Sequence, residues 1–213
     1  MNSITYEEFL EFGPCYLDDP KEKALMDSIA QRQDRWTALD ILELKEIPDE
    51  DKLWAVLREE LIEPEKLHEF ACRCAERALS RVENPDPRSV AAIEAKRAWM
   101  KGEISDAELA AASEAAWVAA REHALYSSSA VLRAGAWAAH GVAYRNDAEY
   151  IAAECANMAI WAALEAAGEH SEGFAGDSDR YAAMDAACFA EQAWQVEELK
   201  KMLREAENNA GSN

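Results

Sequence analysis

Apolar residues recur along most of the chain with the period of an α-helix. The segment "LHEFACRCAERAL", residues 67–79, is the clearest example, because its apolar residues fall at i, i+3, i+4, i+7, i+8 and i+11 and form one helical face. No segment shows the strict alternation of apolar and polar residues that is typical of a half-buried strand. The pattern therefore predicts an all-α fold.

Helix boundaries are marked by capping residues, prolines and glycines. Helices are expected to begin at caps or at a proline in the first turn: Thr5, Asp19, Pro20, Pro64, Pro87 and Ser105. Gly102 is expected to end the helix that begins near Pro87. Further helices are expected over residues 105–126, 128–144, 147–167 and 178–207.

Composition divides the chain into three parts. Residues 1–66 are predicted to form an acidic N-terminal helical unit, residues 67–207 an alanine- and tryptophan-rich bundle of antiparallel helical hairpins, and residues 208–213 a disordered tail. Small residues let helices approach closely, and we expect the tryptophans to fill the gaps that remain in the core: Trp99, Trp117, Trp137, Trp161 and Trp194.

The chain is strongly acidic, with 42 acidic and 22 basic residues and a net charge of −20. Residues 1–70 hold 19 acids and 8 bases, residues 71–145 hold 9 and 10, and residues 146–213 hold 14 and 4. Nucleic-acid binding depends on basic residues that neutralise phosphates, so this charge excludes direct binding to DNA or RNA and attraction to anionic membranes. It predicts a protein partner with a basic surface.

The N-terminal sequence "MNSITYEEFLEF" carries acids where a secretion signal has basic and then apolar residues. No stretch approaches the roughly 18 apolar residues of a membrane span. The five cysteines are an odd number at irregular spacing, which favours free thiols over a disulfide framework. We therefore expect a cytoplasmic protein that does not enter a membrane.

Two cysteines and a histidine occur together in residues 67–79, but their spacing does not suit a metal site. A helix turns Cys72 and Cys74 about 200° away from each other. His68 shares a face with Cys72, yet two ligands do not complete a zinc site. We expect Cys74 in the core and Cys72 at its edge. The chain also lacks a His-Glu-x-x-His motif, a glycine-rich phosphate loop and a nucleophile elbow, so no catalytic, cofactor-binding or metal-binding residue is predicted and no enzyme is expected.

The segment 67–79, followed by "PRSVAAIEAKRAWMKGEIS" and the alanine-rich "WAAHGVAY", resembles an immunity protein family of bacterial polymorphic toxin systems over about residues 67–145. The resembling positions are Leu67, Phe70, Ala71, Cys72, Cys74, Ala75, Glu76, Leu79, Arg88, Ile93, Glu94, Arg97, Trp99, Gly102 and Glu103. The resemblance implies an all-helical, non-catalytic protein that neutralises a toxin by binding it.

The resemblance covers the electrically neutral part of the chain, so the acidic ends are the expected docking surface. The candidate partner-binding residues are Asp49, Glu50, Asp51, Glu59, Glu60, Glu63, Glu172, Asp177 and Asp179. The favoured function is a non-catalytic acidic inhibitor, of the immunity type, that binds and neutralises a toxin or nuclease.

Two alternatives stay open. The first is a phage or mobile-element inhibitor of host defence, such as an anti-CRISPR or anti-restriction protein, whose carboxylates imitate DNA phosphates. The second is a helical bundle that binds a small ligand or a metal around His140, Glu154 and Cys155. Homo-oligomerisation also stays open.

Overall fold

The protein is built almost entirely from helices, as its sequence predicts. The computed structural model describes residues 2–126, 130–143, 148–169 and 177–210. Within these residues no helix has the length and apolarity that a membrane span requires. The elements, in chain order, are β1 (Ser3–Ile4), α1 (Tyr6–Leu10), the 3-10 helix η1 (Cys15–Asp18), α2 (Pro20–Ala30), β2 (Trp36–Thr37), α3 (Ala38–Leu42), α4 (Asp49–Val56), α5 (Pro64–Leu79), α6 (Pro87–Met100), α7 (Asp106–Tyr126), α8 (Ala130–Ala143), α9 (Ala148–Glu169) and α10 (Asp177–Ala210).

The expected capping residues begin the helices. Thr5 accepts the Glu8 amide at 3.2 Å while the Glu8 carboxylate accepts the Thr5 amide at 2.7 Å, which completes a capping box at α1. Asp19 accepts the first amides of α2, with Pro20 at its first position. Gly102 has φ +72°, a left-handed conformation that suits glycine. This conformation ends helix α6. The predicted helix positions are confirmed to within a few residues.

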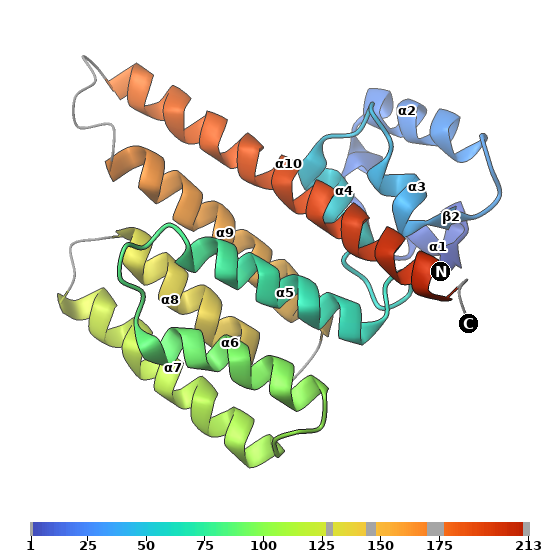
Figure 1. Cartoon of the computed structure of the whole chain (residues 1–213). Coiled ribbons are helices and arrows are strands. Elements are labelled where there is room, and N and C mark those ends of the chain that lie inside the picture. The colour runs from blue at the N-terminus through green and yellow to red at the C-terminus, as the bar shows by residue number, and fades with distance from the viewer. Residues whose placement is uncertain (1, 127–129, 144–147, 170–176, 211–213) are drawn as a thin grey trace.

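Helices α5 to α9 form the bundle, in which successive helices run antiparallel (Figure 1). Helix α5 contacts α6, α8, α9 and α10, while α6, α7 and α8 pack against one another. The faces that meet are lined largely by alanine, including Ala71, Ala138, Ala139, Ala152 and Ala159, each fully buried. Small side chains therefore let the helix axes come close, as expected.

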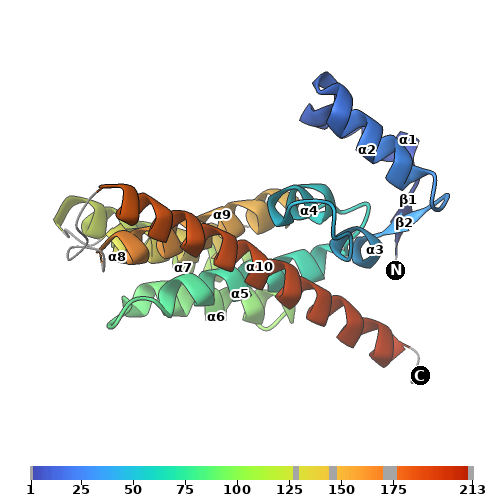
Figure 2. The ribbon, with the colours of Figure 1, turned by 90° about the horizontal axis from the view of Figure 1, so that it is seen from above.

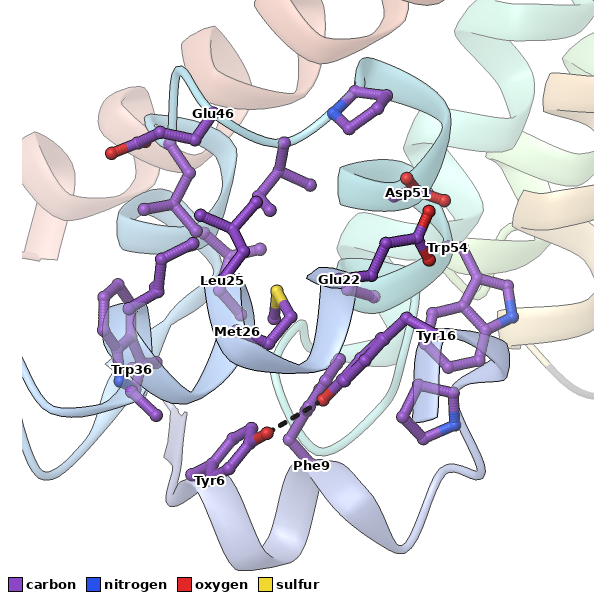
Figure 3. Close-up of a pocket in the computed structure, with 18 of the residues that line it drawn as sticks. Tyr6, Phe9, Tyr16, Glu22, Leu25, Met26, Trp36, Glu46, Asp51 and Trp54 are labelled. Atoms are coloured by element: carbon purple, nitrogen blue, oxygen red, sulfur yellow. Dashed lines mark hydrogen bonds between the residues drawn. The ribbon is translucent and has the colours of Figure 1, made fainter. Parts of the chain in front are cut away.

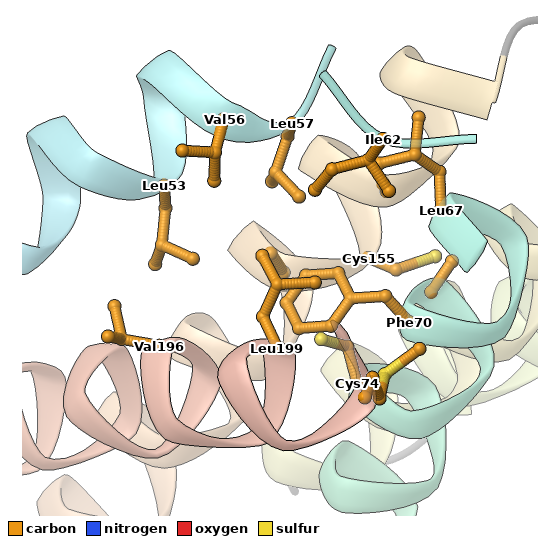
Figure 4. Close-up of a cluster of buried hydrophobic side chains, with 14 of the residues drawn as sticks. Leu53, Val56, Leu57, Ile62, Leu67, Phe70, Cys74, Cys155, Val196 and Leu199 are labelled. Atoms are coloured by element: carbon orange, nitrogen blue, oxygen red, sulfur yellow. The ribbon is translucent and has the colours of Figure 1, made fainter. Parts of the chain in front are cut away.

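Helix α10 joins the bundle to the N-terminal unit. One part of it packs on α9 and α5, and it also contacts α3 and α4, so that it crosses the molecule from end to end (Figure 2). Its residues Val196 and Leu199 face Leu53 and Val56 of α4, with Phe70 of α5 beside them (Figure 4). One continuous core thus runs from the N-terminal unit into the bundle.

The boundaries predicted for the three parts do not coincide with the ends of the elements. The division between residues 66 and 67 falls in the first turn of α5. Helix α10 continues to Ala210, so the first half of the expected tail is helical, while residues 211–213 lie outside the described residues.

The tryptophans of the bundle fill the core only in part, which corrects the expectation. Trp161 is 53% exposed, and the other tryptophans of the bundle are partly exposed. None of the five rings is fully buried, and Trp99 and Trp194 pack against the core clusters from outside. Three of the rings also meet cations: the Lys96 ammonium is 4.4 Å from the Trp99 ring centre, and the Arg121 and Arg77 guanidinium carbons are 4.7 and 4.6 Å from Trp117 and Trp194.

Two smaller expectations are also corrected. Strands β1 and β2 pair antiparallel, with Ser3 opposite Thr37, and two residues each are too few to leave an alternating pattern in the sequence. Cys72 is fully buried and does not lie at the edge of the core, because α5 is covered by helices on several sides. Cys74 lies in the core, as predicted.

The shared core predicts that the N-terminal unit and the bundle unfold together. Leu199→Ala removes a fully buried side chain between them, and we expect it to lower the free energy of unfolding by about 2–5 kcal/mol. Glu197→Ala is the matched control, since that side chain is 68% exposed and pairs with Lys200 of its own helix; we expect a change within about 0.5 kcal/mol. Denaturant unfolding should show a single transition in both variants. A first transition confined to the N-terminal unit and unchanged by Leu199→Ala would contradict the shared core.

Candidate functional site

The predicted partner-binding acids of the N-terminal unit lie at the two ends of α4. Asp49, Glu50 and Asp51 form its first turn, and Glu59 and Glu60 follow its last turn. Three acids at a helix N-terminus interact favourably with the helix dipole. The two groups therefore belong to different surfaces and need separate description.

The acids after α4 are partly engaged in local structure. The backbone N–H of Glu59 donates to a carboxylate oxygen of Glu149 at 2.7 Å, which ties this turn to α9. Glu63 precedes the first turn of α5 and pairs with Lys66 at 2.7 Å, and this hydrogen bond lowers the pKa of its carboxyl group. Glu60 is exposed. These residues face solvent and line no cavity described for the N-terminal unit.

The candidate residues at the other acidic end are only partly within the described structure. Glu172 lies outside the described residues. Asp177 and Asp179 stand in the first turn of α10, and their side chains are outside the described part of the chain.

The first turn of α4 borders a cavity of about 690 Å³ in the N-terminal unit. Its walls come from α1, η1 and α2 on one side and from β2, α3 and α4 on the other. Most of α2 is exposed, and among the described elements it contacts mainly η1, so it stands away from the bundle (Figure 2). In Figure 3, Trp36 and Trp54 mark opposite ends of the cavity, with Met26 between them.

An aromatic cluster forms one wall of this cavity. Phe9 stacks on Tyr16 and meets Trp54 edge-on, with ring centres 6.3 and 6.1 Å apart. The Tyr16 hydroxyl donates to the Tyr6 hydroxyl at 3.2 Å, and Tyr6 in turn donates to Asp27 at 2.8 Å. Burial, together with these hydrogen bonds, raises the pKa of Tyr6 well above its usual value. The wall is thus apolar and uncharged, and its hydroxyls are already paired with each other and with Asp27.

All of the charged residues that line the cavity are acids. They are Glu22 on α2, Glu46 before α4, and Glu50 and Asp51 in the first turn of α4. Glu46 pairs with Arg32 at 2.9 Å, and its pKa is lowered by a hydrogen bond from its own backbone and by that arginine. Glu22, Glu50 and Asp51 form no ion pair with any described residue. The cavity therefore combines aromatic walls with four carboxylates, of which only Glu46 is neutralised by an ion pair among the described residues.

Sequence reasoning found only part of this site. Glu50 and Asp51 were among the predicted acids, whereas Glu22, Glu46 and the aromatic rings were missed. The available signal was the aromatic spacing in "TYEEFLEFGPCYL", where Tyr6, Phe9 and Phe12 recur every three residues. That spacing marks a helix face but does not show that the face lines a cavity.

Two of the three residues of the alternative site in the bundle contact backbone carbonyls of neighbouring helices. His140 donates from Nδ1 to the carbonyl oxygen of Ser113 on α7 at 3.1 Å, while the buried Cys155 thiol faces the Ala138 carbonyl on α8 at 3.6 Å. Burial raises the pKa of that thiol, which disfavours the thiolate a metal needs. No group of three His, Cys, Asp or Glu side chains able to hold a metal ion occurs among the described residues.

A buried lysine lies inside the bundle instead. Lys96 on α6 is fully buried, with its ammonium over the Trp99 ring, and burial lowers its pKa to about 8. His68 packs edge-on against the same indole, and burial together with the Lys96 charge lowers its pKa to about 4. Burial also raises the pKa of Cys72 to about 12. The side chains of Lys96, His68 and Cys72 are therefore almost entirely closed off from solvent.

The buried charge of Lys96 predicts a pH-dependent stability. Below about pH 8 Lys96 is charged in both states, so the folded chain carries the full cost of burying it; from there to about pH 10.5 only the unfolded chain holds the proton, and the free energy of unfolding rises with pH. We expect Lys96→Met to be more stable than the native chain at pH 7 by about 1–3 kcal/mol. The advantage should shrink as the pH rises from 8 to 10 in denaturant titrations. Lys101→Met, at an exposed position after the same helix, should show no such trend, and an advantage for Lys96→Met that is constant with pH would contradict the account.

Comparison of the chain with protein-family models, with curated proteins and with solved structures gave no match.

Proposed function

We propose that the protein is a non-catalytic acidic inhibitor that binds a basic protein, a toxin or a nuclease, and neutralises it through the acid-rimmed cavity of the N-terminal unit. The observation that carries the proposal is the composition of this cavity, whose charged lining residues are all carboxylates set among aromatic rings. The resemblance of residues 67–145 to an immunity family supports the same function.

The charge distribution suits such a task at two ranges. At long range, a net charge of −20 speeds the approach of a basic partner and repels nucleic acids that compete for it. At short range, binding energy in protein interfaces is concentrated in a few aromatic and charged side chains within a partly enclosed patch. Trp54 and Leu25, which line the cavity and are 41% and 36% exposed, are available for this role.

The second candidate function is inhibition of a host defence nuclease by a phage or mobile-element protein, which we call counter-defence. Imitation of DNA requires rows of exposed carboxylates at phosphate spacing, and the acids at the ends of α4 are exposed enough to contribute to one. The cavity adds an apolar component that phosphate mimicry does not need, which favours recognition of protein side chains. The identity of the partner decides between toxin immunity and counter-defence.

We expect the cavity acids to be needed for capture of the partner. The immobilised chain should retain a basic protein from host lysate at about 50 mM salt and release it at about 500 mM. Glu50→Gln/Asp51→Asn, which keeps side-chain shape, should retain much less of it. The captured protein, once purified, should have a toxic or nucleic-acid-cleaving activity that stoichiometric addition of the native chain abolishes.

The matched control is Glu59→Gln/Glu60→Gln, which removes the same charge at the far end of α4. It should capture and inhibit as the native chain does. Equal loss in both double variants would mean that total charge alone attracts the partner. A captured enzyme that stays active when fully bound would contradict an inhibitory function.

A further inference from the structure

We infer that the cavity of the N-terminal unit receives one arginine side chain of the partner protein. This inference rests on the proposed function, and it names the group that the acid-rimmed cavity recognises. Three observations support it: the residues that line the cavity, the exposed apolar residues around it, and an arginine of the chain itself that lies in a similar environment.

The cavity is amphipathic in the way that an arginine side chain is. Leu25, Met26 and Ile29 of α2 supply an apolar surface, against which the methylene stem of a long cationic side chain packs. In Figure 3 the carboxylates of Glu22 and Asp51 reach toward the same side of the cavity. A cation on this apolar stem therefore finds carboxylates on one side and rings on the other.

The aromatic wall favours a guanidinium over an ammonium. A planar guanidinium stacks on aromatic rings and donates two parallel hydrogen bonds to a carboxylate, whereas a lysine ammonium is a more strongly hydrated point charge. Tyr16, Trp36 and Trp54 supply rings, and Glu22, Glu50 and Asp51 supply acceptors that no described residue pairs. Both halves of arginine recognition are therefore present in one enclosure.

Arg58 shows that this aromatic cluster accepts a guanidinium. Its guanidinium carbon lies 5.0 Å from the ring centres of both Phe12 and Trp54. Its Nη1 atom is 3.7 Å from Oε2 of Glu149. Arg58 is not part of the cavity lining and pairs with Glu149, so it does not engage Glu22, Glu50 or Asp51. The cavity offers the same combination of ring and carboxylate to a group from outside the chain.

The exposed apolar residues around the cavity indicate that the arginine belongs to a protein and is not a free small molecule. Leu17, Leu25 and Trp54 are apolar residues of this region that remain substantially exposed. A free small cation would leave them in water, whereas the surface that carries a protruding arginine would cover them. Charge complementarity and this apolar surround together point to a basic protein that inserts one side chain.

The experiment uses n-hexylguanidinium as the probe and the full-length chain labelled with ¹⁵N. Indole N–H signals of Trp36 and Trp54, assigned with Trp36→Phe and Trp54→Phe, should shift in a saturable manner, while those of Trp99 and Trp161 should not. The same titration of Glu50→Gln/Asp51→Asn should show an affinity at least about tenfold lower. In Glu59→Gln/Glu60→Gln the affinity should change less than about twofold. An unshifted Trp161 signal verifies that each variant is folded.

Four results would overturn the assignment. They are no saturable shift at Trp36 and Trp54, an equal shift with n-hexanoate, equal losses in the two double variants, and tighter binding of n-hexyltrimethylammonium than of n-hexylguanidinium. The last result would assign the cavity to a free quaternary amine. If the probe fails while capture of the partner still depends on Glu50 and Asp51, the arginine assignment falls and the proposed inhibitor function stands.

Discussion

Burial of the apolar stripe of α10 is the interaction that positions the candidate site. Leu199 and Val196 are buried against α4 on one side and against α5 and α9 on the other, within a single hydrophobic cluster. Helix α4 has only eight residues, too few to be stable in isolation. Its place is therefore set by this contact, and with it the place of Glu50 and Asp51. The first turn of α4 then faces α2 across the cavity. The packing of α4 on α10 therefore determines where the carboxylates of Glu50 and Asp51 lie.

The distribution of basic residues explains why the cavity stays acidic. In the bundle, arginines of α5, of α6 and of the turn after α5 pair with acids of other helices: Arg73 with Glu198, Arg77 and Arg81 with the fully buried Glu191, and Arg97 with Glu69 and Glu76. Because Glu191 is fully buried, removing Arg77 or Arg81 would leave its charge in the core with less compensation, which holds these two bases in the bundle. The N-terminal unit has few bases to set against its acids, and Arg32 and Lys52 already pair with Glu46 and Asp49. A net negative field at the cavity is the consequence.

Local signals in the sequence were enough for the helices but not for the site. Caps such as Thr5 and Asp19 act through neighbouring amides, so they mark helix ends whatever the tertiary structure. The cavity is different, because Tyr6, Trp36 and Trp54 come from separate elements that only the fold brings together. The tryptophans of the bundle are a related case. Their apolar character predicts burial, but how close two alanine faces pack is a property of the pair of helices and not of either sequence.

Site-specific photo-crosslinking is the most direct test of the central claim, that a basic partner docks at the cavity of the N-terminal unit. A benzophenone amino acid placed at Leu25, on the cavity, is compared with one placed at Trp161, which is 53% exposed on α9. The account predicts that irradiation in the host joins Leu25, and not Trp161, to a basic protein, through a peptide that contains an arginine beside apolar residues. Crosslinks to the same protein from Trp161 and none from Leu25 would place the interface on the bundle and contradict the account.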